Sequence, residues 1–167
     1  MKMKITSLKI MLALVAFTIS TLCYGQSNFK HEKIKLVHDI FHKTTKQNIN
    51  AFMKERGFKI GEINEGNEEY GDELSFTSEF NLITVEYTKG NKVLSVSCIY
   101  AGAPNNVFVE MELKESGYTP TSSKYEDMDG TTRERKIWAK PGTAYLFASA
   151  KDEKEKIGVL AYGIMEE

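Results

Sequence analysis

The stretch that decides the fold occurs twice, first as Met53-Lys54-Glu55-Arg56-Gly57-Phe58 and again as Leu113-Lys114-Glu115-Ser116-Gly117-Tyr118. Lysine, glutamate and glycine recur at matching positions, and the last residue of each copy is aromatic. Each copy has the pattern of a helix end: a charged last turn, a glycine that can adopt the left-handed backbone conformation, and an aromatic residue that starts a strand. This internal similarity predicts that one structural unit is repeated along the chain.

Four strands are predicted after each of these glycines, because stretches rich in β-branched and aromatic residues alternate with turn residues. The turns include Gly71-Asp72, Gly90-Asn91 and Asp129-Gly130. Links this short join antiparallel neighbours, since a parallel crossover needs about a dozen residues or more. The predicted strands are residues 58–64, 73–80, 82–88 and 92–100 in the first unit, and residues 118–125, 131–139, 143–150 and 156–165 in the second.

Helices are predicted ahead of both sets of strands. Residues 29–43 place apolar side chains along one helix face, starting from Ile34. Thr44 and Gln47 have the spacing of a capping box, so a second helix is expected to begin with Thr44 as its N-cap. In the second unit the apolar residues alternate as in a strand, but the repeat requires a helix there and Pro104 suits its first turn.

These elements predict an α+β fold made of two tandem repeats. Residues 26–101 form the first repeat, which begins as a helix-loop-helix, and residues 102–167 form the second. In each repeat the helical part is expected to be followed by a four-stranded antiparallel sheet. Residues 143–150 are apolar on both strand faces, so this strand is expected to be central in its sheet or to lie under a partner.

Residues 1–25 have the composition of a secretory signal peptide. Lysines precede an uncharged apolar run over residues 10–22, and cleavage is expected near Gly25. The run is shorter than the roughly 20 residues that span a membrane as a helix, so no stable span is expected after cleavage. The alternative processing is lipid attachment at Cys23. The mature protein is therefore expected in the periplasm or outside the cell.

The composition excludes several classes of protein. The chain has 167 residues with 22 Lys and Arg against 23 Asp and Glu, so it lacks the basic surface of a dedicated nucleic-acid binder. A charged fraction of only 27%, with 11% aromatic residues, argues against a disordered chain. Loss of Cys23 with the leader leaves Cys98 without a cysteine to pair with. Cys98 alternates with Leu94 and Val96 on an apolar strand face, which predicts a buried, unreactive thiol.

The three histidines, His31, His38 and His42, fall on one face of the first predicted helix. His38 and His42 have the spacing of a zinc-chelating pair on a helix, so the three residues form a weak candidate metal site. A structural zinc would need a fourth ligand, and the chain has no second cluster of cysteine or histidine to offer one. The alternative is a solvated polar face, and no cofactor is predicted.

Catalytic motifs are missing from the sequence. It has neither a glycine-rich phosphate loop nor a Gly-x-Ser-x-Gly elbow, so the protein is not expected to be an enzyme. Glu134, Lys136 and Trp138 share one strand face, which places the sole tryptophan in polar surroundings. An outward tryptophan of this kind is typical of a binding hot spot. The alternative is that Trp138 covers the edge of the core.

The order of elements resembles the β-lactamase inhibitory protein family, in which two helix-plus-four-strand repeats form a concave eight-stranded surface that grips a protein target. The resemblance covers most of the mature chain and rests on element order, without a motif specific to the family. The chain differs from the family in lacking a disulfide within each repeat, because Cys98 is unpaired. Since a shared fold does not transfer a site, no residue role is carried over.

We therefore expect an exported, non-enzymatic binding module. Its open sheet face, with Trp138, Lys136 and Glu134, is expected to bind a protein or an envelope component in an inhibitor-like or immunity-like role. One alternative is a carrier that holds a small ligand between the sheet and the helices. Another is a weakly metal-dependent enzyme.

Overall fold

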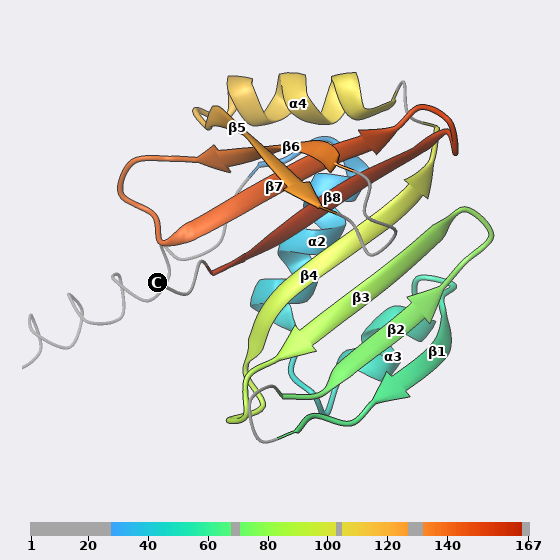
Figure 1. The fold of residues 1–167 in the computed structure, drawn as a ribbon. Helices are drawn as coiled ribbons and strands as arrows, with labels where there is room; N and C mark the ends of the chain where they lie inside the picture. Colours follow the sequence, from blue (N-terminus) through green and yellow to red (C-terminus); the bar gives the residue numbers. More distant parts are fainter. Residues whose placement is uncertain (1–27, 68–70, 103–104, 127–131, 165–167) are drawn as a thin grey trace, which may run out of the picture.

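The computed structural model describes residues 28–67, 71–102, 105–126 and 132–164. Within these ranges the chain forms one antiparallel sheet with helices on one of its faces (Figure 1). The predicted signal peptide, Pro104 and the turn at Asp129-Gly130 lie outside the described residues. The helices are α2 (Glu32–Lys43), α3 (Ile49–Lys54) and α4 (Asn106–Glu115), and the strands are β1 (Lys59–Asn64), β2 (Glu73–Thr77), β3 (Asn81–Tyr87), β4 (Val93–Ala101), β5 (Thr119–Glu126), β6 (Thr132–Ala139), β7 (Tyr145–Asp152) and β8 (Ile157–Ile164).

In this described part of the chain the sheet has eight strands in the order β1-β2-β3-β4-β8-β7-β6-β5. β4 and β8 pair antiparallel, from Ser95 opposite Gly163 to Ala101 opposite Ile157. The predicted α+β class is confirmed, and each predicted strand is present close to its predicted position. The strands of the two predicted units belong to one sheet, which is joined through β4 and β8. β4 and β8 would otherwise be sheet edges, and their pairing satisfies the backbone groups of both strands.

The two copies of the repeated stretch end their helices with the same hydrogen bonds. Gly57 and Gly117 have φ angles of 79° and 86°, in the left-handed region that favours glycine. In the first copy the Phe58 N–H donates to the Met53 carbonyl at 3.1 Å, and the equivalent bond in the second copy measures 3.0 Å. This is the Schellman arrangement, in which the residue after the glycine closes the last helical turn. Both predicted helix ends are confirmed.

The predicted capping box at Thr44 is wrong. Thr44 ends α2 instead, where its hydroxyl donates to the Ile40 carbonyl at 2.7 Å. α3 begins at Ile49 after Asn48, whose side-chain oxygen accepts from the Thr45 N–H at 2.7 Å. The Thr44 N–H donates to the same carbonyl at 3.1 Å, so both groups of Thr44 close the last turn of α2. The hydroxyl is therefore not used to cap the next helix.

α4 is helical, as the repeat predicted and despite the alternation of its apolar residues. Residues four apart share a face of a helix. α4 therefore buries Val109 and Leu113 against the sheet, whereas Val107 and Met111 are exposed. The outward face of α4 carries large apolar side chains as a result.

The core lies between the helices and one face of the sheet. α2 crosses behind β4 and β8 (Figure 1), and its Ile34, Val37 and Ile40 are fully buried. Each such side chain contributes about 1.5–3 kcal/mol relative to an exposed one. Cys98 is also fully buried, and burial raises the pKa of its thiol to about 12. The predicted burial of Cys98 is confirmed, and a raised pKa disfavours the thiolate, which is the nucleophilic form.

The opposite face of the sheet has no helix over it in the described residues, and we call it the open face (Figure 1). The sheet is strongly twisted, so that Figure 1 shows β2–β4 face-on and β6–β8 closer to edge-on. Side chains alternate between the two faces along each strand. From the strand register, the open face includes Ser95, Ser97, Ile99, Ile137, Leu146, Ala148, Ala150, Val159, Ala161 and Gly163.

Gly57→Ala is expected to lower the free energy of unfolding by about 1 kcal/mol, because a left-handed backbone is strained for a residue with a Cβ. Nothing lies within 4 Å of the position that this Cβ would take, so the loss comes from the backbone alone. Gly90→Ala is the matched control, since Gly90 is not among the described glycines with positive φ. Urea denaturation measures both variants, and equal losses would contradict a specific role for the helix end.

Candidate functional site

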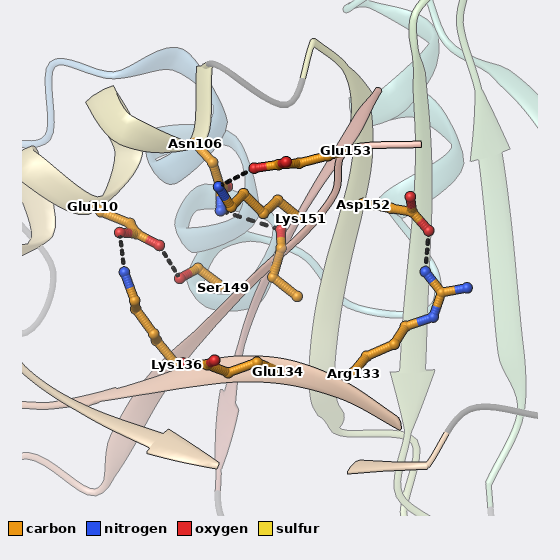
Figure 2. A pocket seen from close by; sticks show the side chains of 10 residues that line it. Asn106, Glu110, Arg133, Glu134, Lys136, Ser149, Lys151, Asp152 and Glu153 are labelled. Atoms are coloured by element: carbon orange, nitrogen blue, oxygen red, sulfur yellow. Dashed lines mark hydrogen bonds and ion pairs between the residues drawn. The ribbon is translucent and has the colours of Figure 1, made fainter. Parts of the chain in front are cut away.

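A polar cleft lies between α4 and the strands β6 and β7 (Figure 2). Its volume is about 370 Å³. It combines charged side chains of both signs with an amide and a hydroxyl. Its lining comprises Asn106 and Glu110 from α4, Arg133, Glu134 and Lys136 from β6, and Ser149, Ala150, Lys151, Asp152 and Glu153 from β7 and the turn after it.

Glu110 is the centre of the hydrogen bonds in the cleft. Its carboxylate accepts from Lys136 Nζ at 2.6 Å and from the Ser149 hydroxyl at 3.2 Å (Figure 2). Ser149 in turn accepts from Trp138 Nε1 at 2.9 Å. Ser149 and Trp138 are buried, so their hydrogen bond is shielded from water. The four side chains link the buried indole to an ammonium group at the surface.

Four other charged groups of the cleft form two ion pairs within the chain. Arg133 forms an ion pair with Asp152, and Lys151 Nζ lies 2.6 Å from a carboxylate oxygen of Glu153 (Figure 2). The Glu110 carboxylate thus accepts from a hydroxyl and from an ammonium group at once. The arrangement is suited to binding a polar ligand through hydrogen bonds.

Trp138 is buried rather than exposed, so the predicted hot spot on the open face is wrong. Only 3% of Trp138 is exposed, and its ring lies on the helix-covered side of the sheet, where it pairs across the strands with the buried Phe147. Lys136 and Glu134 lie on the same side and line the polar cleft. The alternative, that Trp138 covers the edge of the core, is confirmed. The charged residues that share the strand face of Trp138 made this face look solvent-exposed. In the structure the face is covered by α4, and Glu110 of α4 pairs with Lys136, which the sequence alone did not show.

Glu110 and Ser149 are the cleft residues that the sequence analysis missed. Ser149 follows Phe147 on the same strand face, so an isolated hydroxyl in an apolar strand was the available signal. A buried hydroxyl of this kind needs a partner, and Trp138 is one. Glu110 gave no signal of its own, because its role depends on how α4 is placed over β6 and β7.

The histidines are not a uniformly solvated face. His31 is half-buried and caps α2, where its Nδ1 accepts from the Lys33 N–H at 3.3 Å. His38 is only 5% exposed and packs between the rings of Phe29 and Tyr162. His42 is exposed, and its Nε2 lies 2.9 Å from the Tyr162 hydroxyl. The alternative of solvated histidines is therefore wrong for His38. The aliphatic residues of α2 predicted a narrower buried face, but Phe29 and Tyr162 of β8 also cover the side of the helix that carries His38.

The burial of His38 perturbs its titration. Desolvation lowers its pKa to about 4, and the nearby His42 and Lys43 add to this effect while Asp39 opposes it. The ring centroids of His38 and His42 are 4.4 Å apart, and desolvation also lowers the pKa of His42. Among the described residues, no group of three or more His, Cys, Asp or Glu is placed so that it could hold a metal ion.

The open face contains a second cavity, a hollow of about 360 Å³. Its floor is made of the small residues Ala148, Ala161 and Gly163. Larger side chains surround it, and Arg135 is one of them. Glu110, Lys136 and Ser149 of the polar cleft lie on the helix-covered side of the sheet, and the two cavities share no lining residue. The remaining residues around it are Ser95, Ile137, Leu146, Phe147, Tyr162 and Ile164.

Comparison of the chain with protein-family models, with curated proteins and with solved structures found no match. The helices in the described residues lack the length and hydrophobicity that a membrane-spanning segment requires.

Ser149→Ala is expected to lower the free energy of unfolding by about 1–3 kcal/mol, because the Trp138 N–H would be buried without an acceptor. The fluorescence of Trp138, the sole tryptophan, reports the change directly during denaturation. Ser122→Ala, at an exposed position of β5, is the control and should change stability by less than about 0.5 kcal/mol. A Ser149→Ala protein as stable as the wild type would contradict the linked hydrogen bonds.

The free energy of unfolding is expected to fall as the pH drops from 6.5 towards 4. The pKa of His38 is about 4 in the folded protein against 6.5 for an ordinary histidine, so the unfolded chain binds a proton first. The full effect is on the order of 3 kcal/mol. His38→Gln should flatten this part of the pH profile, as measured by urea denaturation across the range. An unchanged slope in the variant would show that other groups cause the loss.

Proposed function

We propose that the protein is an exported, non-enzymatic binding module that uses the open face of its sheet to bind a protein or a component of the cell envelope. The observation that carries this proposal is the composition of β7 and β8. Both strands carry apolar residues on both faces, but the helices of the described residues cover only one face. Strands with two apolar faces are normally covered on both sides. A partner on the open face would supply the second cover.

The apolar part of the open face runs across several neighbouring strands. Ala161 of β8 lies opposite Ala148 of β7, which in turn lies opposite Ile137 of β6. On the other side of β8, Val159 lies opposite Ile99 of β4. Contiguous apolar surface of this kind is typical of interaction sites. The proposed contact therefore centres on β8 and does not involve Trp138.

We also infer that the single sheet consists of two copies of one unit, residues 26–101 and 102–167. Two features support this inference. The helix ends at Gly57 and Gly117 have the same hydrogen bonds, and the strand order on one side of the β4–β8 pair mirrors that on the other. The resemblance to the β-lactamase inhibitory protein family supports an inhibitor-like or immunity-like role. The predicted leader, residues 1–25, supports a location in the periplasm or outside the cell.

A carrier of a small polar ligand is the second candidate function, and the cleft of Figure 2 favours it. The cleft lies between α4 and the sheet, as the carrier hypothesis expected. It does not lie under the core aromatic residues, since Phe76 and Phe147 are fully buried. A polar ligand would bind to the Glu110 and Lys136 end, where hydrogen-bonding groups converge.

Val159→Lys is expected to abolish capture of a partner from an envelope extract, because it places a charge at the centre of the apolar open face. Met111→Lys is the matched control, since it makes the same kind of change on the exposed face of α4. Pull-down read by mass spectrometry compares the two variants with the wild type, and circular dichroism checks that both are folded. Loss in both variants, or in neither, would contradict binding through the open face.

A further inference from the structure

We propose that the hollow in the open face receives a large apolar side chain from a partner protein, and that Arg135 binds a carboxylate next to that side chain. The partner is therefore a protein segment that carries a bulky apolar residue beside Asp or Glu. This inference rests on the proposed function and specifies the chemistry of its partner.

The close approach of β4 to β8 prevents a larger side chain on the floor of the hollow. A Cβ on Gly163 would lie 2.7 Å from the Leu94 carbonyl oxygen and 3.0 Å from Ser95, so a larger residue does not fit there. Ala148 and Ala161 add only methyl groups beside it. The surrounding Leu146 and Ile137 are larger, which leaves a recess with apolar walls. A recess of this shape is complementary to one protruding aromatic or branched aliphatic side chain.

Arg135 supplies a cation at the rim of the hollow. Its Nε donates to the Ser123 hydroxyl at 3.2 Å, and its guanidinium carbon lies 5.5 Å from the centre of the Tyr125 ring. These contacts hold the side chain in place before a partner arrives, which reduces the entropy lost on binding. The terminal nitrogens of Arg135 make no ion pair with a described carboxylate, whereas Arg133 and Lys136 are paired with Asp152 and Glu110.

The positions of Arg135 and Glu86 on the open face favour one orientation of the bound protein segment. A guanidinium with two available terminal nitrogens binds a carboxylate through two parallel hydrogen bonds. Glu86 lies at the opposite margin of the open face, where its carboxylate accepts from the Ser95 hydroxyl at 2.5 Å. The partner's carboxylate is therefore placed at the β6 side of the face. Binding to an anionic lipid surface would require a cluster of several cationic side chains. Arg135 is the one cationic side chain among the residues that line the hollow.

The test selects binders of the purified full chain from a displayed library of random twelve-residue peptides. The expected result is enrichment of peptides with a large apolar residue next to Asp or Glu. Their affinity should fall by about tenfold or more in Arg135→Glu, and less in Arg135→Lys, which keeps the charge but loses the paired hydrogen bonds. Ala161→Leu fills the hollow and should also weaken binding. Arg56→Glu, a charge reversal on an exposed residue after α3, is the control and should bind as the wild type does.

The outcomes separate this inference from the proposed function. Peptides that lose binding in Ala161→Leu but keep it in Arg135→Glu would overturn the carboxylate site and leave open-face binding intact. Peptides that bind both variants normally, or no enrichment at all, would overturn the inference. If the Val159→Lys protein also kept its partner, the proposed function would fail as well. Arg135-dependent binding to phosphatidylglycerol vesicles, without acidic peptides, would replace the protein partner by a lipid.

Discussion

The pairing of β4 with β8 is the constraint on which the rest of the molecule depends. It joins the strands that follow α3 to the strands that follow α4, and α2 packs across the junction. At one end of the junction a side chain on Gly158 would collide with the ring of Tyr100. That ring carries the hydroxyl that donates to Asn106 at 2.5 Å, and Asn106 donates to the Ala150 carbonyl at 3.2 Å. The junction therefore also positions the first turn of α4 above β7, and with it one wall of the polar cleft.

The parts of the fold that were predictable from sequence are those determined by local chemistry. The turn residues separated the strands correctly, and the glycines at 57 and 117 marked helix ends because few other residues adopt a left-handed backbone. The wrong predictions concern side chains whose environment is set by distant segments. Thr44, His38 and Trp138 depend on which element packs against them, and periodicity within one element does not contain that information.

In the candidate site, too, the features set by local sequence were predicted correctly and those set by distant segments were not. The sequence placed Glu134 and Lys136 on one strand face with Trp138, which is correct, but it assigned that face to solvent. The true open face was indicated by a different signal, the strand over residues 143–150 with two apolar faces. That pattern left two interpretations, a central strand or a strand under a partner. β7 is inside the sheet, and no helix of the described residues covers its open side, so both interpretations remain compatible with the same strand.

Cys98 has a practical consequence for experiments on this molecule. It is the free cysteine of the described residues, it is fully buried, and its thiol stays protonated at neutral pH. Its neighbour Ser97 points to the other side of β4. A sulfhydryl introduced at that neighbouring position would react with a maleimide dye while Cys98 remained silent. A chain without the predicted leader, which contains Cys23, would thus accept a single spectroscopic label in the middle of the β-surface without prior removal of a native thiol.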